Sequence, residues 1–161
     1  MNHRTKIMSS RYEYAGFWVR LGASIVDTLL VMLLTIPLLI SYYGFETYWL
    51  AAQNGDFLGL GEIIISWLLP FGATIAFWVK KQATPGKILF SLKVLDEKTG
   101  QPISLQQSII RYLGYFVSTI GLLLGFIWIA FDAKKQGWHD KMAGTVVVRD
   151  LVLDVIPVLV D

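Results

Sequence analysis

Three long apolar runs constrain the fold of this chain more than any other feature of its sequence. They lie at about residues 21–42, 63–79 and 112–131, and few charged residues interrupt them. A helix needs about 20 apolar residues, in a range of about 17 to 25, to cross the hydrocarbon core of a bilayer. Lipid favours such runs as helices, because a helix satisfies every backbone polar group within its own segment. The sequence therefore predicts an integral membrane protein.

The composition supports this prediction and excludes several functional classes. Hydrophobic residues make up 55% of the 161 residues and charged residues 16%, whereas about a quarter of the residues in a soluble domain are charged. A net charge of +2 is too small for a general nucleic-acid binder. The chain has no cysteine, and His3 and His139 lie far apart in sequence. We therefore expect no nucleic-acid partner, no metal and no cofactor.

The charges around the apolar runs predict their orientation, because cytoplasmic loops carry an excess of lysine and arginine. The region before the first run is basic, and so is the stretch after the second run. The loop between these runs is acidic and holds no lysine or arginine. We therefore expect residues 1–12 to form a cytoplasmic N-terminal segment.

The third run admits two topologies. A single crossing places the C-terminus outside, yet Lys134 and Lys135 follow the run and favour the inside. Residues 105–132 number 28, too few for two full crossings of about 40 residues, but enough for a shallow re-entrant hairpin that turns near residues 118–121. We favour this hairpin, with a cytoplasmic C-terminus, over the single crossing.

The polar connector at residues 80–111 predicts a small elaboration on the cytoplasmic side. Alternation at residues 92–95 is typical of a short strand, and residues 144–150 form a second strand candidate. Pairing these strands requires both to lie on one side of the membrane, which again favours the hairpin. The predicted fold is an all-α membrane protein, a small transmembrane helix bundle with a short cytoplasmic β-hairpin-like elaboration. Residues 150–161 are expected to form a C-terminal tail.

Asp27 is the charge that most needs an explanation, because it interrupts the first apolar run. A charge at the bilayer centre costs at least ~2.5 kcal/mol, so Asp27 should face the protein interior or a watery cavity and have a partner. The candidate partners are Arg20, two turns away on nearly the same helix face, and Arg111, with Asp132 joining them under the hairpin model. Three roles stay open, namely a structural ion pair, a proton or cation relay, and a site for a lipid headgroup or another anion.

Two other groups of side chains are weaker candidates. Basic residues near the ends of the apolar runs either contact lipid headgroups or merely anchor the orientation; they are Lys80, Lys81, Lys134 and Lys135. His139 and Asp140 resemble a catalytic pair, but no nucleophile pattern lies nearby. We therefore expect no catalytic residues and no enzymatic activity.

Several motifs in a fixed order resemble the RDD family of bacterial membrane proteins. They are Ala15–Leu21 leading to Asp27, Ala83–Lys87 followed by Leu92–Asp96, Arg111, and Gln136–Val148. The resemblance covers about residues 13–149, which are expected to form one membrane domain. The family is named for one arginine and two aspartates. Arg20 and Asp27 match the first two, and for the third we choose Asp140, with Asp96 and Asp132 as rivals.

The resemblance implies a multi-pass protein of the bacterial plasma (inner) membrane. Ion transport, including sodium–proton exchange, has been proposed for some members of the family. It thus implies cation or proton exchange through Arg20, Asp27, Arg111 and Asp140. The alternative is a non-transporting scaffold or assembly partner in which these residues are structural. Three short helices are few for an exchanger, so the expected partners are the lipid bilayer, further copies of the chain or another membrane protein.

Overall fold

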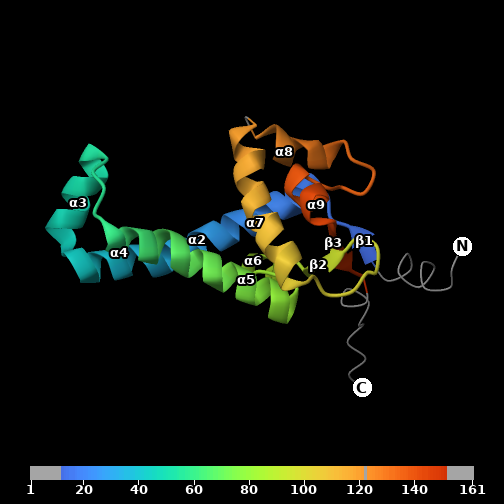
Figure 1. Cartoon of the computed structure of the whole chain (residues 1–161), viewed down its shortest axis with the longest axis horizontal. Coiled ribbons are helices and arrows are strands. Elements are labelled where there is room, and N and C mark those ends of the chain that lie inside the picture. The colour runs from blue at the N-terminus through green and yellow to red at the C-terminus, as the bar shows by residue number, and fades with distance from the viewer. Residues whose placement is uncertain (1–11, 122, 152–161) are drawn as a thin grey trace, which may run out of the picture.

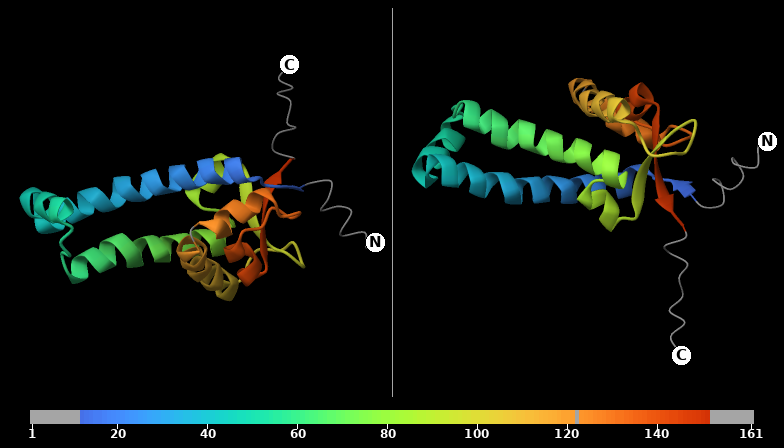
Figure 2. Two further views of the ribbon diagram at one scale, coloured as in Figure 1. Left: turned by 90° about the horizontal axis from the view of Figure 1, so that it is seen from above. Right: turned by 60° about the horizontal axis from the view of Figure 1, so that its bottom comes forward.

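Two long helices lie side by side and extend away from a layer that holds most of the remaining elements (Figures 1 and 2). This computed structural model describes residues 12–121 and 123–151, so almost all of the expected N-terminal segment and C-terminal tail lie outside the described residues. The first long helix is α2 (Phe17–Tyr43). The second consists of α4 (Leu60–Ile63), η1 (Ile64–Leu68) and α5 (Leu69–Lys81). A short helix, α3 (Phe45–Asn54), lies in the connection at the end farthest from the sheet (Figure 1).

Both long helices meet the requirements of a membrane span. The first has 27 residues with a mean hydropathy of 2.3, and the second has 22 residues, Leu60–Lys81, with a mean hydropathy of 1.7. Large apolar side chains such as Leu33 and Trp67 are exposed along them, as expected of helices that face lipid rather than water. The first two predicted runs are therefore confirmed as helices of membrane type.

The second long helix is irregular for a local reason. A single π-helical segment, Ile64–Leu68, precedes Pro70. Proline has no backbone N–H to donate, and its ring clashes with the preceding turn, so the helix must adjust there. A π-bulge makes this adjustment without ending the helix.

The third run is bent rather than straight. It forms α7 (Leu105–Ile120), α8 (Leu124–Ile127) and the 3-10 turn η2 (Trp128–Ala130). The two parts meet at 113°, the geometry of a broken span or a re-entrant loop. The helix α7 begins at the capping box of Ser104 and Gln107, in which each side chain bonds to the other residue's backbone N–H. The bend lies immediately after the turn expected at residues 118–121.

A three-stranded antiparallel sheet joins the two ends of the membrane domain. Its strands are β1 (Tyr12–Tyr14), β2 (Leu92–Asp96) and β3 (Thr145–Asp150), in the order β1-β3-β2. The predicted pairing of the second and third strands is confirmed, with Leu92 opposite Arg149 and Asp96 opposite Thr145. The predicted hairpin-like pair is thus part of a larger sheet, because β1 adds to the free edge of β3.

The sheet determines how the third run is threaded. Strand β1 precedes the first long helix, β2 follows the second, and β3 follows the bent run. Strands of one hydrogen-bonded sheet cannot lie on opposite sides of a bilayer. The bent run therefore begins and ends on the same side, as the re-entrant hairpin requires.

The three-stranded sheet and the helices beside it, α7, α8 and α9 (Trp138–Ala143), form what we call the sheet layer. The main core lies where this layer meets the nearby ends of the long helices. It includes Ala23 from α2, Trp78 from α5, Val94 from β2 and Val147 from β3. The short helix α9 packs against α7 (Figure 1). At their contact, a Cβ atom added to Gly114 would lie 2.8 Å from the Cα atom of His139. A glycine is needed there because two backbones meet.

We predict that Gly114→Ala lowers the thermal stability of the detergent-solubilised protein, because overpacking a close backbone contact costs typically about 1–3 kcal/mol. The matched control is Gly72→Ala, also within a helix, where an added Cβ has no atom within 4 Å. That change should raise stability slightly, by about 0.5–1 kcal/mol, because alanine favours the helix. Equal melting temperatures for the two variants would contradict the predicted close packing of α7 on α9.

Candidate functional site

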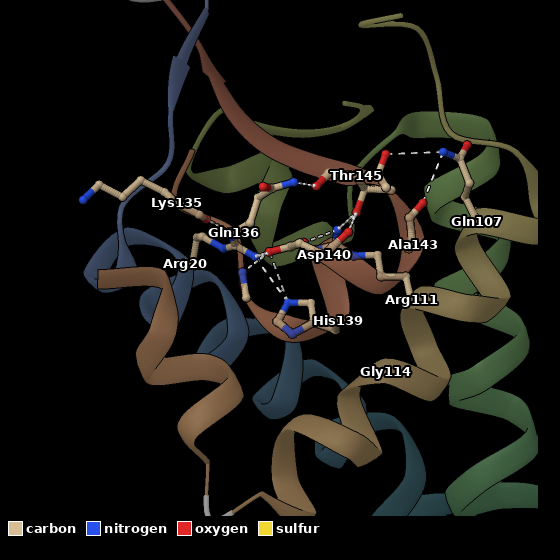
Figure 3. A network of polar contacts seen from close by, with 12 residues as sticks. Arg20, Gln107, Arg111, Gly114, Lys135, Gln136, His139, Asp140, Ala143 and Thr145 are labelled. Atoms are coloured by element: carbon tan, nitrogen blue, oxygen red, sulfur yellow. Dashed lines mark hydrogen bonds and ion pairs between the residues drawn. The ribbon is translucent and has the colours of Figure 1, made fainter. Parts of the chain in front are cut away.

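A buried carboxylate, Asp140, lies between two arginines, Arg20 and Arg111 (Figure 3). The Arg20 Nη2 atom donates to Asp140 Oδ2 at 2.5 Å, and Arg111 Nη1 forms an ion pair with the other oxygen, Oδ1. The backbone N–H of Gly137 also donates to Oδ2, at 2.8 Å, and so stabilises the first turn of α9. The exposed fraction of the arginine and aspartate side chains is 6% for Arg20 and 0% for Arg111 and Asp140. We call Arg20, Asp140 and Arg111 the charge triad.

The triad connects segments that are far apart in the sequence. Arg20 comes from the first turn of α2, Arg111 from α7 and Asp140 from α9. Arg20 also donates to the backbone carbonyl of Lys135 at 2.6 Å, and Arg111 donates to Thr145 Oγ1, in β3, at 2.6 Å. The three charged residues therefore hold the N-terminal end of α2, α7, α9 and the sheet together.

Aromatic side chains complete the environment of Arg111. Its guanidinium carbon lies 5.2 Å from the ring centre of Trp78 and 5.9 Å from that of Tyr115. A cation over an aromatic face gains about 0.5–2 kcal/mol, and more when water is excluded. Trp78 is on α5, so this contact attaches the second long helix to the triad.

The arginines keep Asp140 ionised. Burial by itself raises the pKa of this carboxyl, but the charges of Arg111 and Arg20 outweigh burial and leave the pKa well below its usual value. A group in this state does not release or take up protons near neutral pH. Asp140 therefore has the properties of a fixed countercharge.

His139 is neutral in this setting. Burial is the largest cause that lowers its pKa to about 3, and the nearby arginines lower it further while Asp140 opposes them. Its Nδ1 atom lies 3.3 Å from Ser118 Oγ, whose hydroxyl donates to the carbonyl of Gly114. Nδ1 is therefore assigned the proton, which leaves Nε2 free to accept from Arg20 Nη2 at 3.3 Å. A neutral, buried imidazole of this kind orients Arg20.

Asp27 is not part of the triad. Its carboxylate accepts hydrogen bonds from Thr84 Oγ1 at 2.5 Å and from the backbone N–H of Gly86 at 2.6 Å. The ammonium of Lys87 lies 3.7 Å away. These three residues belong to the turn that begins α6 (Pro85–Leu89), so Asp27 caps a helix N-terminus, where negative charge is favoured. The turn lies so close to α2 that a Cβ atom added to Gly86 would be 2.2 Å from the carbonyl oxygen of Ala23. A glycine is therefore needed at this position.

The predicted partners of Asp27 are therefore wrong. Two turns of helix separate it from Arg20, about 10 Å along the axis, and Arg20 and Arg111 are both paired with Asp140. Asp132 instead accepts from the backbone of Lys134 and Gln136 and pairs with Lys141. Sequence spacing identified the charged residues but not their pairing, because the partners come from other elements.

The remaining predicted residues lie at the surface of the sheet layer or near it. Lys80 and Lys81 are exposed in the last turn of α5. Lys134 pairs with Glu97 at 2.6 Å, and the ammonium of Lys135 donates to the carbonyl of Ala130 at 3.1 Å. Contact of these four lysines with lipid headgroups stays a prediction. Within residues 12–121 and 123–151, no group of three acidic or histidine side chains is arranged to hold a metal ion.

Comparison with known proteins adds the family context. A sequence model described as the RDD family matches residues 14–144. An uncharacterized membrane protein of Bacillus subtilis, YteJ, is 33% identical over 86% of this chain and 83% of its own length. Another B. subtilis protein, the uncharacterized YxaI, is 31% identical over 83% of this chain and 96% of its own length.

A longer relative comes from Mycobacterium tuberculosis. The proline-rich antigen homolog of that organism is 29% identical over 89% of this chain, and the match spans 61% of the relative's length. The chain thus corresponds to about three fifths of that protein. No solved structure matches the chain.

We predict that acid weakens the fold through His139. Because its folded pKa of about 3 lies below the ordinary value of 6.5, the unfolded chain binds an extra proton as the pH falls below 6.5. The contribution of neutral His139 to the free energy of unfolding is therefore fully present above pH 6.5. It is lost as the pH falls toward 3, at about 1.4 kcal/mol per pH unit. The free energy of unfolding in detergent micelles, measured at pH 6.5 and pH 5, checks this. His139→Gln should reduce the difference between the two pH values, and an undiminished difference would refute the assignment.

Proposed function

The chain belongs to the RDD family, and from this premise we propose that it is a multi-pass protein of the bacterial plasma membrane that exchanges cations and protons through Asp27. The charge triad has a different role in this proposal. It is a structural ion cluster that holds the sheet layer against the membrane helices.

The proposed orientation places the sheet layer in the cytoplasm. Lysines and arginines are concentrated in and around that layer, including Lys80, Lys81, Lys93 and Lys134. The opposite end of the long helices, around α3 (Figure 1), has Glu46, Asp56 and Glu62 and no lysine or arginine between residues 43 and 62. Positive charge is enriched on the cytoplasmic side of membrane proteins. This asymmetry supports a cytoplasmic N-terminus and a cytoplasmic β3.

The surroundings of Asp27 are the observation that carries the exchange proposal. Asp27 lies ten residues into α2, or about 15 Å along its axis, and its side chain is 21% exposed. It lines a cavity of about 330 Å³ together with Ser24, Thr28, Thr74 and Lys87. An ionisable group in a membrane helix that faces a partly polar cavity is a typical element of an ion or proton pathway.

Lys87 gives Asp27 a replaceable partner. The separation of 3.7 Å between Lys87 Nζ and Asp27 Oδ2 is longer than a hydrogen bond, so the pair is an ion pair without direct proton donation. A sodium ion or a proton that binds the carboxylate takes over the role of this ammonium. Exchange then consists of alternate occupation of Asp27 by the cation and by the proton, with Lys87 as the resident countercharge between them.

Asp140 does not share this role in the proposal. Both of its oxygens are engaged, by Arg20 and Gly137 on one side and Arg111 on the other. Its lowered pKa keeps it charged. A carboxylate that is already neutralised by two buried arginines has a structural role in this proposal.

The two long spans found among residues 12–121 and 123–151 are too few to enclose a pathway. The exposed apolar faces of α2 and α5 offer surfaces on which further copies of the chain can pack within the membrane. We therefore include a homo-oligomer in the proposal, with Asp27 of each copy facing a shared cavity.

The test is proton-coupled cation flux in proteoliposomes that contain the purified protein. Asp27→Asn should reduce the flux to the level of empty vesicles. The amide keeps the shape of the side chain, but it has no negative charge and no titratable proton, so it cannot exchange a proton for a cation. The matched control is Asp56→Asn, which removes a carboxylate from the exposed loop before α4 and should leave flux unchanged. Wild-type flux in a folded Asp27→Asn variant would reject the proposal.

A non-transporting scaffold is the second candidate, and the charge triad favours it. A buried ion cluster that joins distant segments fixes their register, and this role requires no transported ion. If the wild type shows no flux and Asp27→Asn mainly lowers the amount of folded protein, the scaffold explains both results. In that case, crosslinking from the β2 region should trap one specific partner protein.

A further inference from the structure

An apolar cavity of about 460 Å³ lies beside the charge triad. It is bordered by α2, α6, α7, α8, η2 and α9, and its apolar wall is formed by Phe17, Leu21, Phe126, Ile127 and Ile129. Sites for small molecules have volumes of about 300–1,000 Å³ and walls of this kind, with a few placed polar groups. The cavity therefore has the size and lining of a ligand site.

The polar groups of this cavity gather on one part of its wall. They include Arg20, Lys87 and His139, which are 5%, 5% and 1% exposed when the backbone atoms are included. The contacts of the Lys87 ammonium are a hydrogen bond to Thr84 Oγ1 at 3.3 Å and the ion pair with Asp27 at 3.7 Å. An ammonium has three donors, so Lys87 keeps donor capacity for a group that enters the cavity.

The charges around the cavity do not cancel. Of the charged residues, Arg20 and Lys87 line the cavity, and ion pairs behind its wall connect them to Asp140, Arg111 and Asp27. These three positive and two negative charges leave a net charge of +1. His139 adds nothing near neutral pH, because its pKa is lowered to about 3. An uncompensated buried charge is costly. An anion held against this part of the wall would offset that cost.

The mouth of the cavity is apolar. Leu21, Leu123 and Ile127 line the cavity and are 39%, 52% and 44% exposed. A second hollow of about 480 Å³ shares Phe17 and Ile127 with the first and is bordered by Trp18, Phe131 and Lys135. In a membrane, such a rim is covered by lipid rather than by water. The ligand that fits both ends has an apolar chain and an anionic head.

We propose that this cavity binds one acidic phospholipid from the surrounding leaflet. An acyl chain lies along Phe17, Leu21 and Phe126, and the phosphate lies against Arg20 and Lys87. A water-soluble anion would leave the apolar wall without contacts, and a zwitterionic lipid would bring a positive group along with its phosphate. The bound lipid completes the charge balance of the sheet layer, a role that does not depend on ion exchange at Asp27.

Native mass spectrometry of the delipidated full-length protein can test the proposal. The protein is titrated with phosphatidylglycerol or phosphatidylcholine, and the lipids retained on each chain are counted. The wild type should retain one phosphatidylglycerol with about tenfold higher affinity than phosphatidylcholine, equivalent to about 1.4 kcal/mol. Equal retention of the two lipids would show general annular lipid and overturn the proposal.

Three variants identify the site. Leu21→Trp fills the cavity without changing charge and should lower retention of phosphatidylglycerol about tenfold, again about 1.4 kcal/mol. Leu29→Trp places the same ring on an exposed position of the same helix, outside this cavity, and should leave retention unchanged. Lys87→Gln should remove the preference for phosphatidylglycerol while keeping a polar side chain. Equal retention by Leu21→Trp and Leu29→Trp, or an unchanged preference in a folded Lys87→Gln variant, would overturn the proposal.

Discussion

The structure depends on one buried carboxylate with two arginine partners. Asp140 sits where α2, α7 and α9 meet, and its countercharges, Arg20 and Arg111, come from residues about 120 and 30 positions earlier in the chain. Each of the three would be costly to bury alone. Their pairing therefore requires the sheet layer to assemble in one way. The bend of the third run follows from the same requirement, since the chain must return to the side of β1 before it reaches Asp140 and β3.

About two turns further along α2, Asp27 forms a second charged contact, which has a different role. The Asp27 carboxylate accepts hydrogen bonds from Thr84 and Gly86 and forms an ion pair with Lys87, all at the start of α6. Lys87 also lines the cavity next to the triad. One helix thus presents an arginine to a closed ion cluster and an aspartate to an open cavity. The difference between them is physical. Both carboxylates accept hydrogen bonds, but Asp140 is paired closely with two buried arginines, whereas the lysine of Asp27 lies 3.7 Å away, farther than a hydrogen bond.

The sequence predicted the parts of this molecule that depend on local pattern. Run length and hydropathy identified both long helices, and alternation identified β2. The pairing of β2 with β3 was also expected, and charge asymmetry gave an orientation that stays a prediction. These features depend on residues close to one another in the chain or on a strong periodic pattern.

The parts that could not be predicted depend on contacts between distant segments. Strand β1 is three residues long and forms because β3 offers a free edge, which no local pattern reveals. The residues Arg20, Asp27, Arg111 and Asp140 were all identified as candidates, but Asp27 was assigned to the wrong partners. Its true partners lie in the turn Thr84–Lys87, within the polar connector. In that turn Gly86 directly follows Pro85 at the start of α6. This glycine was the signal that another backbone, that of α2, approaches there.

The fold depends most directly on Asp140 as the fixed countercharge of two buried arginines. The decisive measurement is the free energy of unfolding, in detergent micelles near neutral pH, of Asp140→Asn beside Asp132→Asn. Asp132 pairs with the partly exposed Lys141, so its amide variant should cost less than about 1 kcal/mol. Asp140→Asn leaves two buried guanidinium groups without a countercharge and should cost about 3–5 kcal/mol. Equal costs for the two variants would contradict the account.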